Sequence, residues 1–296
     1  MSSNSDHSGH PNPLLSTKSI SRLGGLTNEN YVLTADDRQY VLRLPGVGTS
    51  EYISRSDEYT AALLTAKIGV NVPVLFFDEK SGLQLASFMP GKTLSEDGFK
   101  DKGSIARAAE TFRRLHTSNE KFASEFNVFA MISRYLEVID SKEIAVPDGY
   151  KEALAKSDII KEGLARHPNP IVPCHCDPLA ENFIDTGARV YLIDWEYAGN
   201  NDPMWDLADL IVEANFESWQ QDHLLFSYFN GNVPVVQKSR MMMYRALCDL
   251  LWTLWGMIQF ANKNPADDFW AYATMRLQRY QKLIATKEFD QALLAL

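Results

Sequence analysis

Three side chains near the centre of the chain have the types and order of a site that transfers a phosphoryl group. Asp177 and Asn182 lie on one predicted loop, and Asp194 follows beyond a pair of short apolar runs. Carboxylate and amide oxygens are the ligands that Mg²⁺ prefers, and Mg²⁺ commonly carries nucleotide phosphates. An aspartate that is not a metal ligand can act as a base toward a hydroxyl group. These residues therefore predict magnesium-dependent transfer of a phosphoryl group to an alcohol.

A predicted β-hairpin would bring these side chains together. Apolar runs at 183–184 and 190–193 flank a turn that contains Gly, Thr and Asp. The ends of a hairpin meet, so Asn182 and Asp194 are expected side by side, with Asp177 on the loop in front of them. The alternative is a solvated turn beside a structural strand pair, because Asp and Asn are common turn residues. The second Asp at the far end of the hairpin favours the phosphoryl-transfer interpretation.

The motifs H-C-D-x-x-x-x-N and I-D-W-E resemble those of the aminoglycoside phosphotransferase and choline kinase superfamily, which shares the protein-kinase fold. This resemblance implies an α+β, two-lobed protein-kinase-like fold with a small β-rich N-lobe and a large, mainly helical C-lobe. It implies Asp177 as the catalytic base and Asn182 and Asp194 as magnesium ligands. His175 is expected to pack behind the loop and bond backbone groups, and Asp206 to be a structural partner of the loop.

Composition limits the possible partners and the compartment. The net charge of -9 over 296 residues argues against nucleic acid or an anionic membrane as partner, and is compatible with a cationic substrate. The three cysteines form no disulfide framework, and Cys174 and Cys176 lack the second pair that a structural zinc site needs. Residues 1–15 are polar and are expected to form a disordered leader, and the apolar region 246–260 is too short to span a bilayer. We therefore expect a soluble cytoplasmic enzyme.

The N-lobe, residues 16–90, contains the candidate phosphate-binding loop. A double glycine precedes two predicted strands at 31–34 and 39–44. Backbone N–H groups can approach phosphate oxygens closely at such a loop, although a double glycine can also be only a turn. The candidate residues for nucleotide phosphates are Gly24, Gly25, Thr27 and Asn28.

A basic residue ends the second of these strands. In the choline kinase branch, an Arg in a similar L-R-L-x-G context takes the place of the kinase Lys that pairs nucleotide phosphates, which implies this role for Arg43. A surface charge is the alternative. The acidic partner should lie on the next helix, whose expected N-cap is Ser56. Glu58 is preferred over Glu51 and Asp57, although an acid in a first turn can simply favour the helix dipole.

A second hairpin, at 72–77 and 83–88, leads to the expected connection between the lobes. Pro90 and Gly91 end its last strand. By analogy with the fold, the backbone of Ser87, Phe88 and Met89 would be available to an adenine ring. The C-lobe, residues 91–296, then begins with a predicted helix at 101–116 that has one apolar face.

The candidate acceptor pocket is aromatic. Trp252 and Trp255 lie on one face of one predicted helix, Tyr272 lies on the next helix, and Glu213 ends the helix after the hairpin. Aromatic rings with a nearby carboxylate attract a quaternary ammonium group by cation–π and Coulomb interactions. A Trp pair at this spacing is also common in protein cores, so the pair has two interpretations.

Here the sequence is similar to the choline/ethanolamine kinases over roughly residues 20 to 285. L-W-T-L-W-G-M-I-Q resembles their W-x-L-W-x-x-x-Q helix, and I-D-W-E-Y followed by D-L-A resembles their motif after the hairpin. The resemblance implies that choline contacts the residues Trp252, Trp255, Tyr272, Glu213 and Tyr197. One departure is Leu179, where a polar residue is often found.

Transfer of the γ-phosphoryl group from ATP with Mg²⁺ to choline, giving phosphocholine and ADP, is the expected activity. Ethanolamine, thiamine or an aminoglycoside is the alternative acceptor. A catalytically silent choline-binding module is the alternative from another class, and the three residues Asp177, Asn182 and Asp194 argue against it.

Overall fold

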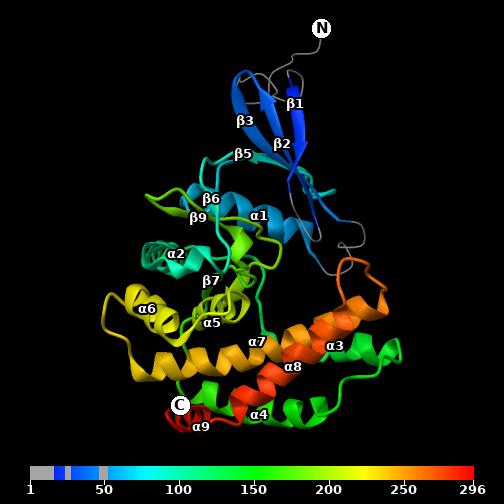
Figure 1. Ribbon diagram of the computed structural model, residues 1–296, viewed down its shortest axis with the longest axis vertical. Helices are drawn as coiled ribbons and strands as arrows, with labels where there is room; N and C mark the ends of the chain where they lie inside the picture. The colour runs from blue at the N-terminus through cyan, green and yellow to red at the C-terminus, as the bar shows by residue number, and fades with distance from the viewer. Residues whose placement is uncertain (1–16, 24–27, 47–52) are drawn as a thin grey trace.

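An antiparallel sheet forms the N-terminal part of the molecule, which the computed structural model describes over residues 17–23, 28–46 and 53–296 (Figure 1). Its strand order is β1-β2-β3-β5-β4. The bounds are β1 Thr17–Arg22, β2 Glu29–Ala35, β3 Arg38–Leu44, β4 Val74–Phe77 and β5 Gln84–Ser87. Asp36 and Asp37 join β2 to β3 with φ of 49° and 60°, the left-handed conformation that a two-residue hairpin turn requires. The expected leader lies outside the described residues.

Helix α1, Arg55–Lys67, packs beside β4 and begins two residues earlier than predicted. The sequence predicted Ser56 as the N-cap, and this prediction is wrong. Ser54 has the extended backbone of a cap, and its hydroxyl accepts a hydrogen bond from the Asp57 N–H at 3.4 Å. The Ser56 hydroxyl instead donates to Glu79 at 2.7 Å, outside the helix.

The larger, helical part follows the sheet in the chain. Its helices are α2 Lys102–His116, α3 Val128–Ser141, α4 Tyr150–Arg166, α5 Met204–Glu213, α6 Ser218–Tyr228, α7 Val235–Ala261, α8 Phe269–Ile284 and α9 Lys287–Leu294, with short 3-10 turns η3 Gly98–Lys100 and η4 Ala180–Asn182. The predicted apolar face of α2 is confirmed. Ile105, Ala108, Ala109, Phe112 and Leu115 all have 0% exposure, so this face lies in the core.

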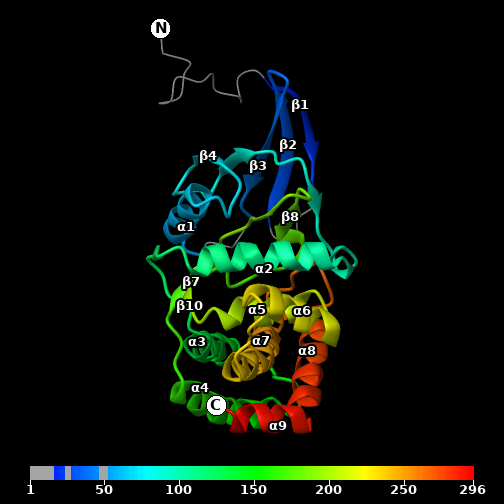
Figure 2. The same cartoon turned by 90° about the vertical axis from the view of Figure 1, so that its left-hand side faces the viewer.

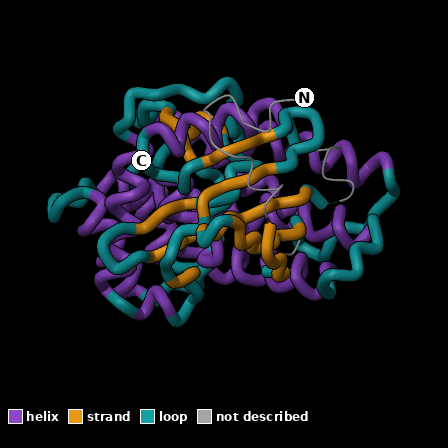
Figure 3. The backbone as a smooth tube through the Cα atoms, turned by 90° about the horizontal axis from the view of Figure 1, so that it is seen from above, coloured by secondary structure: helices purple, strands orange, loops and turns teal. Residues whose placement is uncertain are grey.

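Two small sheets connect the N-terminal sheet to the helices. Strands β6 Lys92–Thr93, β8 Phe183–Asp185 and β9 Val190–Leu192 form one sheet, and β7 Val172–Cys174 pairs with β10 Gly199–Asn201. The β8–β9 pair is the predicted hairpin, although Asp185 belongs to its first strand rather than to its turn. It lies between the N-terminal sheet and α2 (Figure 2), and the view from above shows the strands crossing over the helices (Figure 3).

Helix α7 is the centre of the helical part and packs against α3, α4, α5, α8 and α9. It carries buried charges that need partners in the core. Arg240 is buried and forms an ion pair with Asp202, which also accepts a hydrogen bond from the Tyr244 hydroxyl at 3.2 Å. None of the helices in the described part of the chain is both long and apolar enough to cross a membrane.

Candidate active site

The loop between β7 and β8, residues 175–182, is called the catalytic loop below, and α5 holds its backbone. The carboxylate of Asp206 accepts hydrogen bonds from the N–H groups of His175 and Cys176, both at 2.8 Å. It also contacts the ring of His116 at 3.0 Å. Cys176 has a φ of 69°, a left-handed conformation that is costly for most side chains. These bonds fix the turn that presents Asp177, as the sequence predicted for Asp206.

His175 bonds backbone groups on both sides of its ring. Its Nε2 lies 2.8 Å from the Ile193 carbonyl oxygen, and its Nδ1 lies 3.3 Å from the Asp177 N–H. One nitrogen therefore donates and the other accepts, which is the pattern of a neutral imidazole. Complete burial lowers the pKa of His175, against a smaller opposing effect of Asp206. The His175 ring therefore packs behind the catalytic loop and bonds its backbone, as the sequence predicted.

The catalytic hairpin, β8 and β9, brings Asn182 close to Asp194. The Ile193 N–H donates to the Asn182 carbonyl oxygen at 2.9 Å, immediately before Asp194. The Asn182 side-chain nitrogen donates to the Asp177 carbonyl oxygen at 3.1 Å, so the side-chain oxygen is the atom left for a metal. Asp194 has a φ of 67°, which aspartate tolerates better than most residues.

Asp177 lies among other acidic groups. Burial raises the pKa of Asp177 well above its usual value, and the charges of Glu213 and Asp194 add to this effect. Arg276 opposes the shift. An aspartate with a raised pKa is a stronger base once ionised, which suits a group that accepts a proton from a hydroxyl.

Arg43 joins the N-terminal sheet to the catalytic hairpin through three carboxylates. Its guanidinium contacts Glu58 at 2.5 Å, Asp194 at 3.0 Å and Glu196 at 3.1 Å. Burial disfavours the charge of Arg43, but Asp194 and the two glutamates together raise the pKa of the guanidinium. The predicted pairing of Arg43 with Glu58 is present. Arg55 contacts Glu58 from the other side at 2.6 Å.

Glu196 is the member of this cluster that the sequence analysis missed as a site residue. Burial and the neighbouring Asp194 raise the pKa of Glu196 to about 7, against the lowering effect of Arg43. Its carboxylate also accepts a hydrogen bond from the Asn28 side chain at 3.2 Å. The available signal was its position two residues after Asp194, but no local pattern shows which distant arginine it meets.

The oxygen atoms around Arg43 fit a nucleotide-bound magnesium ion. Glu58, Asp194 and Glu196 each offer an oxygen within 4.8 Å of the others. When all three carboxylates are ionised, they exceed the two arginines that face them by one negative charge. The Asn182 side-chain oxygen and the part-exposed Asp194 carboxylate add the hard donors that Mg²⁺ prefers.

The remaining predicted nucleotide residues are placed only in part. Gly24, Gly25 and Thr27 lie outside the described residues. The Asn28 side chain is buried and accepts from the Gly46 N–H at 3.2 Å. At the connection between the lobes, the Ser87 N–H bonds the Pro73 carbonyl oxygen and the Phe88 N–H bonds the Gln39 carbonyl oxygen. The Met89 N–H has no hydrogen-bond partner within the described ranges, so it is the N–H of the three that an adenine ring could use.

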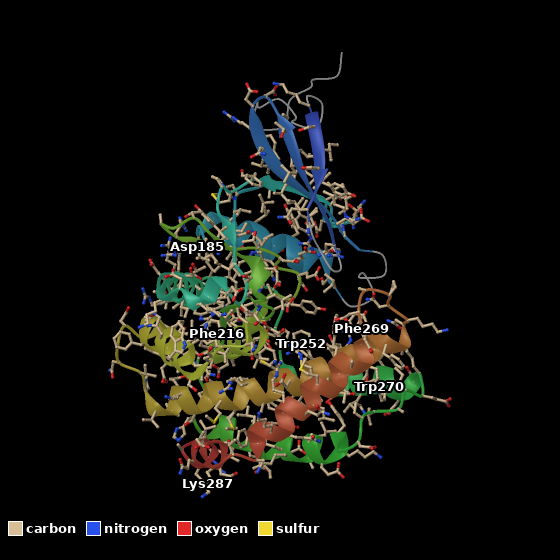
Figure 4. All side chains as sticks on the ribbon, in the orientation of Figure 1. Asp185, Phe216, Trp252, Phe269, Trp270 and Lys287 are labelled. Atoms are coloured by element: carbon tan, nitrogen blue, oxygen red, sulfur yellow. The ribbon has the colours of Figure 1, made fainter. Side chains whose placement is uncertain are left out.

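The predicted aromatic residues form one continuous cluster. Trp252 packs edge-on against Tyr197 and Trp255, with ring centres 5.8 and 6.3 Å apart. Trp255 also packs edge-on against Tyr272 at 5.8 Å and against Phe269 at 5.5 Å, a residue that the sequence analysis did not identify. Figure 4 places Trp252 and Phe269 on the sides of α7 and α8 that face the N-terminal sheet.

Glu213 lies beside this cluster but already has a cationic partner. Arg276 contacts the two Glu213 oxygens through two nitrogens, each at 2.6 Å. The same guanidinium lies 4.8 Å from the centre of the Tyr272 ring. The electrostatic attraction that the sequence analysis assigned to Glu213 is therefore partly neutralised inside the protein.

The chain is similar to a known family of phosphotransferases and to solved structures of its members. The model of the phosphotransferase enzyme family matches residues 19–244. A crystal structure of a choline/ethanolamine kinase family protein from Mesorhizobium loti is 45% identical, covers 96% of this chain and 95% of its own, and has a TM-score of 0.87. The chain belongs to the choline/ethanolamine kinase family of phosphotransferases.

Other solved structures agree with this assignment. Choline kinase LicA from Streptococcus pneumoniae is 32% identical with a TM-score of 0.79, covering 92% of this chain and 95% of its own. A structure of LicA in complex with AMP is 30% identical with a TM-score of 0.75, and the match covers 91% of this chain and 92% of that structure. A thermostable mutant of an aminoglycoside phosphotransferase is 16% identical with a TM-score of 0.67, and the match covers 93% of this chain and 97% of that structure. This similarity shows that the two proteins share a fold.

This kinase therefore has the two-lobed, protein-kinase-like α+β fold that the sequence predicted. It is an ATP- and magnesium-dependent kinase of a small-molecule alcohol. The family leaves open which alcohol it phosphorylates, and which residues of this chain bind each substrate.

Proposed function

We propose that the protein is a choline kinase, which transfers the γ-phosphoryl group of ATP to the hydroxyl of choline and releases phosphocholine and ADP. The aromatic cluster is the observation that carries this proposal. Tyr197, Trp252, Trp255 and Tyr272 form one set of edge-on ring contacts. Aromatic faces attract a trimethylammonium group without hydrogen bonds, which that group cannot make.

The contacts support the following roles for the site residues under this proposal. Asp177 orients the acceptor hydroxyl and accepts its proton, and His175 positions the loop. Asn182 and Asp194 would hold Mg²⁺, which neutralises charge on the transferring phosphoryl group when bound. Arg43 contributes a fixed positive charge beside Asp194, and Glu58 and Glu196 hold it in place.

Under this proposal the N-lobe binds the nucleotide and the C-lobe binds the acceptor and carries out catalysis. Residues 16–90 form the lobe that binds the nucleotide phosphates, and residues 91–296 carry the catalytic loop, the metal ligands and the acceptor pocket. The charge of Glu213 helps to raise the pKa of Asp177, which supports a single pocket that joins the base to the aromatic cluster.

Release of ADP tests the proposal with ATP, Mg²⁺ and a panel of choline, ethanolamine, thiamine and kanamycin. We expect the highest kcat/KM with choline. A higher value with ethanolamine would overturn the choline assignment and keep the kinase chemistry. No ADP release with any of the four acceptors would favour the silent binding module.

A further inference from the structure

A buried carboxylate lies behind the aromatic cluster and has no assigned role. Asp209 is on α5, one turn before Glu213, and has 0% exposure. One of its oxygens accepts a hydrogen bond from the indole N–H of Trp252 at 3.2 Å. Its other oxygen, Oδ2, is buried and has no hydrogen-bond partner in the part of the chain that the structure describes.

Arginines form ion pairs with two neighbouring buried carboxylates, Glu213 and Asp249, but not with Asp209 in the described part of the chain. Glu213 is paired with Arg276, and Asp249 on α7 is paired with Arg279 at 2.5 Å. Asp209 makes no ion pair within residues 17–23, 28–46 and 53–296. In the described part of the chain its donors are neutral, the indole N–H of Trp252 and the thiol of Cys248. A buried carboxylate without a cationic partner is a costly arrangement, so a cation that arrives nearby is stabilised by it.

The surroundings of Asp209 connect it to the acceptor pocket. The charged, titratable or hydrogen-bonding groups that face it are Glu213 on α5, Cys248 and Trp252 on α7, Arg276 on α8, and Cys176 and Asp177 on the catalytic loop. Burial raises the pKa of Asp209 well above its usual value, and Glu213 and Asp177 raise it further. The hydrogen bond from Trp252 and the charge of Arg276 oppose this shift.

We propose that Asp209 is a specificity-determining residue for the acceptor, which holds the Trp252 indole in place and supplies a buried negative charge behind it that favours cationic alcohols. The inference deepens the proposed function and rests on it. Asp209 acts through Trp252 and through its charge, and it does not touch the reacting atoms. Glu213 contributes less of this selectivity because Arg276 engages both of its oxygens.

Two acceptors of the same shape separate charge from packing. Choline and 3,3-dimethylbutan-1-ol differ in that a carbon replaces the charged nitrogen, so the ratio of their kcat/KM values measures the selectivity for charge. Asp209→Asn removes the negative charge and keeps an oxygen that accepts the indole hydrogen bond. Trp252→Phe removes the indole donor and keeps the carboxylate. Asp222→Asn is the matched control, because Asp222 is exposed and pairs with Lys238 at the surface.

At pH values where Asp209 is ionised, we expect Asp209→Asn to lower the choline-to-isostere ratio on the order of tenfold, the effect of one charge several ångströms away in a partly screened site. Trp252→Phe should raise the KM for both acceptors and keep most of the ratio. Asp222→Asn should match the wild type. The wild-type ratio should rise with pH as Asp209 loses its proton, and it should rise less in Asp209→Asn. The ionised Asp177 also favours the cationic acceptor, so the difference between the two profiles is the part that belongs to Asp209.

The outcomes distinguish this inference from the proposed function. A wild type that phosphorylates choline, with an Asp209→Asn ratio within twofold of it across the pH range, would overturn the inference alone. A wild type that turns over the neutral alcohol as well as choline would also overturn the inference and leave choline phosphorylation standing. A wild type that does not phosphorylate choline would overturn the proposed function. If Asp209→Asn does not fold, the pH dependence of the wild-type ratio decides, and a flat profile would overturn the role of Asp209.

Discussion

Removing the charge of Arg43 should destabilise the fold as well as the site. The guanidinium is 8% exposed, Glu58 is 1% exposed and Glu196 is 7% exposed, so water does little to replace the lost partner. Arg43→Met leaves Glu196 and Asp194 without their closest cation, while Arg55 still contacts Glu58. Loss of one partner from a buried ion pair costs about 3–5 kcal/mol. At roughly 2 °C per kcal/mol for a chain of this size, Tm should fall by about 6–10 °C.

A double-mutant cycle separates the Arg43–Glu58 contact from other effects of the substitutions. Unfolding free energies of the wild type, Arg43→Met, Glu58→Gln and the double variant are measured by urea titration. The double variant should be more stable than the sum of the two single effects predicts, by at least about 1.5 kcal/mol, since the second change removes a carboxylate that has already lost a partner. Additive effects within about 0.5 kcal/mol would refute this account of the cluster.

Three further predictions concern the acceptor, the loop and the metal. Trp255→Ala should raise the KM for choline about 2- to 30-fold, the range for loss of a cation–π contact, and leave the KM for ATP nearly unchanged; equal effects on both would favour a core role. Asp206→Asn should lower kcat at least about tenfold with little change in the KM for choline, because one acceptor of the His175 and Cys176 N–H groups is lost; wild-type kcat would contradict the positioning role. Excess chelator should abolish ADP release and added Mg²⁺ should restore it, whereas turnover that survives chelation would exclude the metal role of Asn182 and Asp194.

Local sequence patterns were sufficient for the catalytic loop and its hairpin. Asn182 and Asp194 lie at the adjacent ends of the hairpin because the apolar runs and turn residues define which residues of β8 and β9 pair. The α2 core face followed equally well from helical periodicity. The N-cap of α1 could not be predicted in this way, because Ser54 and Ser56 are both good cap residues and only the backbone conformation distinguishes them.

Contacts between distant segments could not be predicted from such patterns. Arg43 and Glu196 are far apart in the chain, and Glu213 and Arg276 come from different helices. The sequence analysis therefore identified Glu213 as an acidic group of the pocket but not the arginine that neutralises it. Asp209 had no local signal at all, since its significance depends on the absence of an arginine partner in the described part of the fold.

The central claim is that Asp177 activates the hydroxyl of choline for phosphoryl transfer from ATP. Phosphocholine is measured directly by phosphorus NMR after incubation of wild type or Asp177→Asn with ATP, Mg²⁺ and choline. Wild type should form phosphocholine, and Asp177→Asn should form it about 10²- to 10⁴-fold more slowly, the usual contribution of a general base, while still binding ATP. Phosphocholine formation by Asp177→Asn at the wild-type rate, or none by the wild type, would contradict the account.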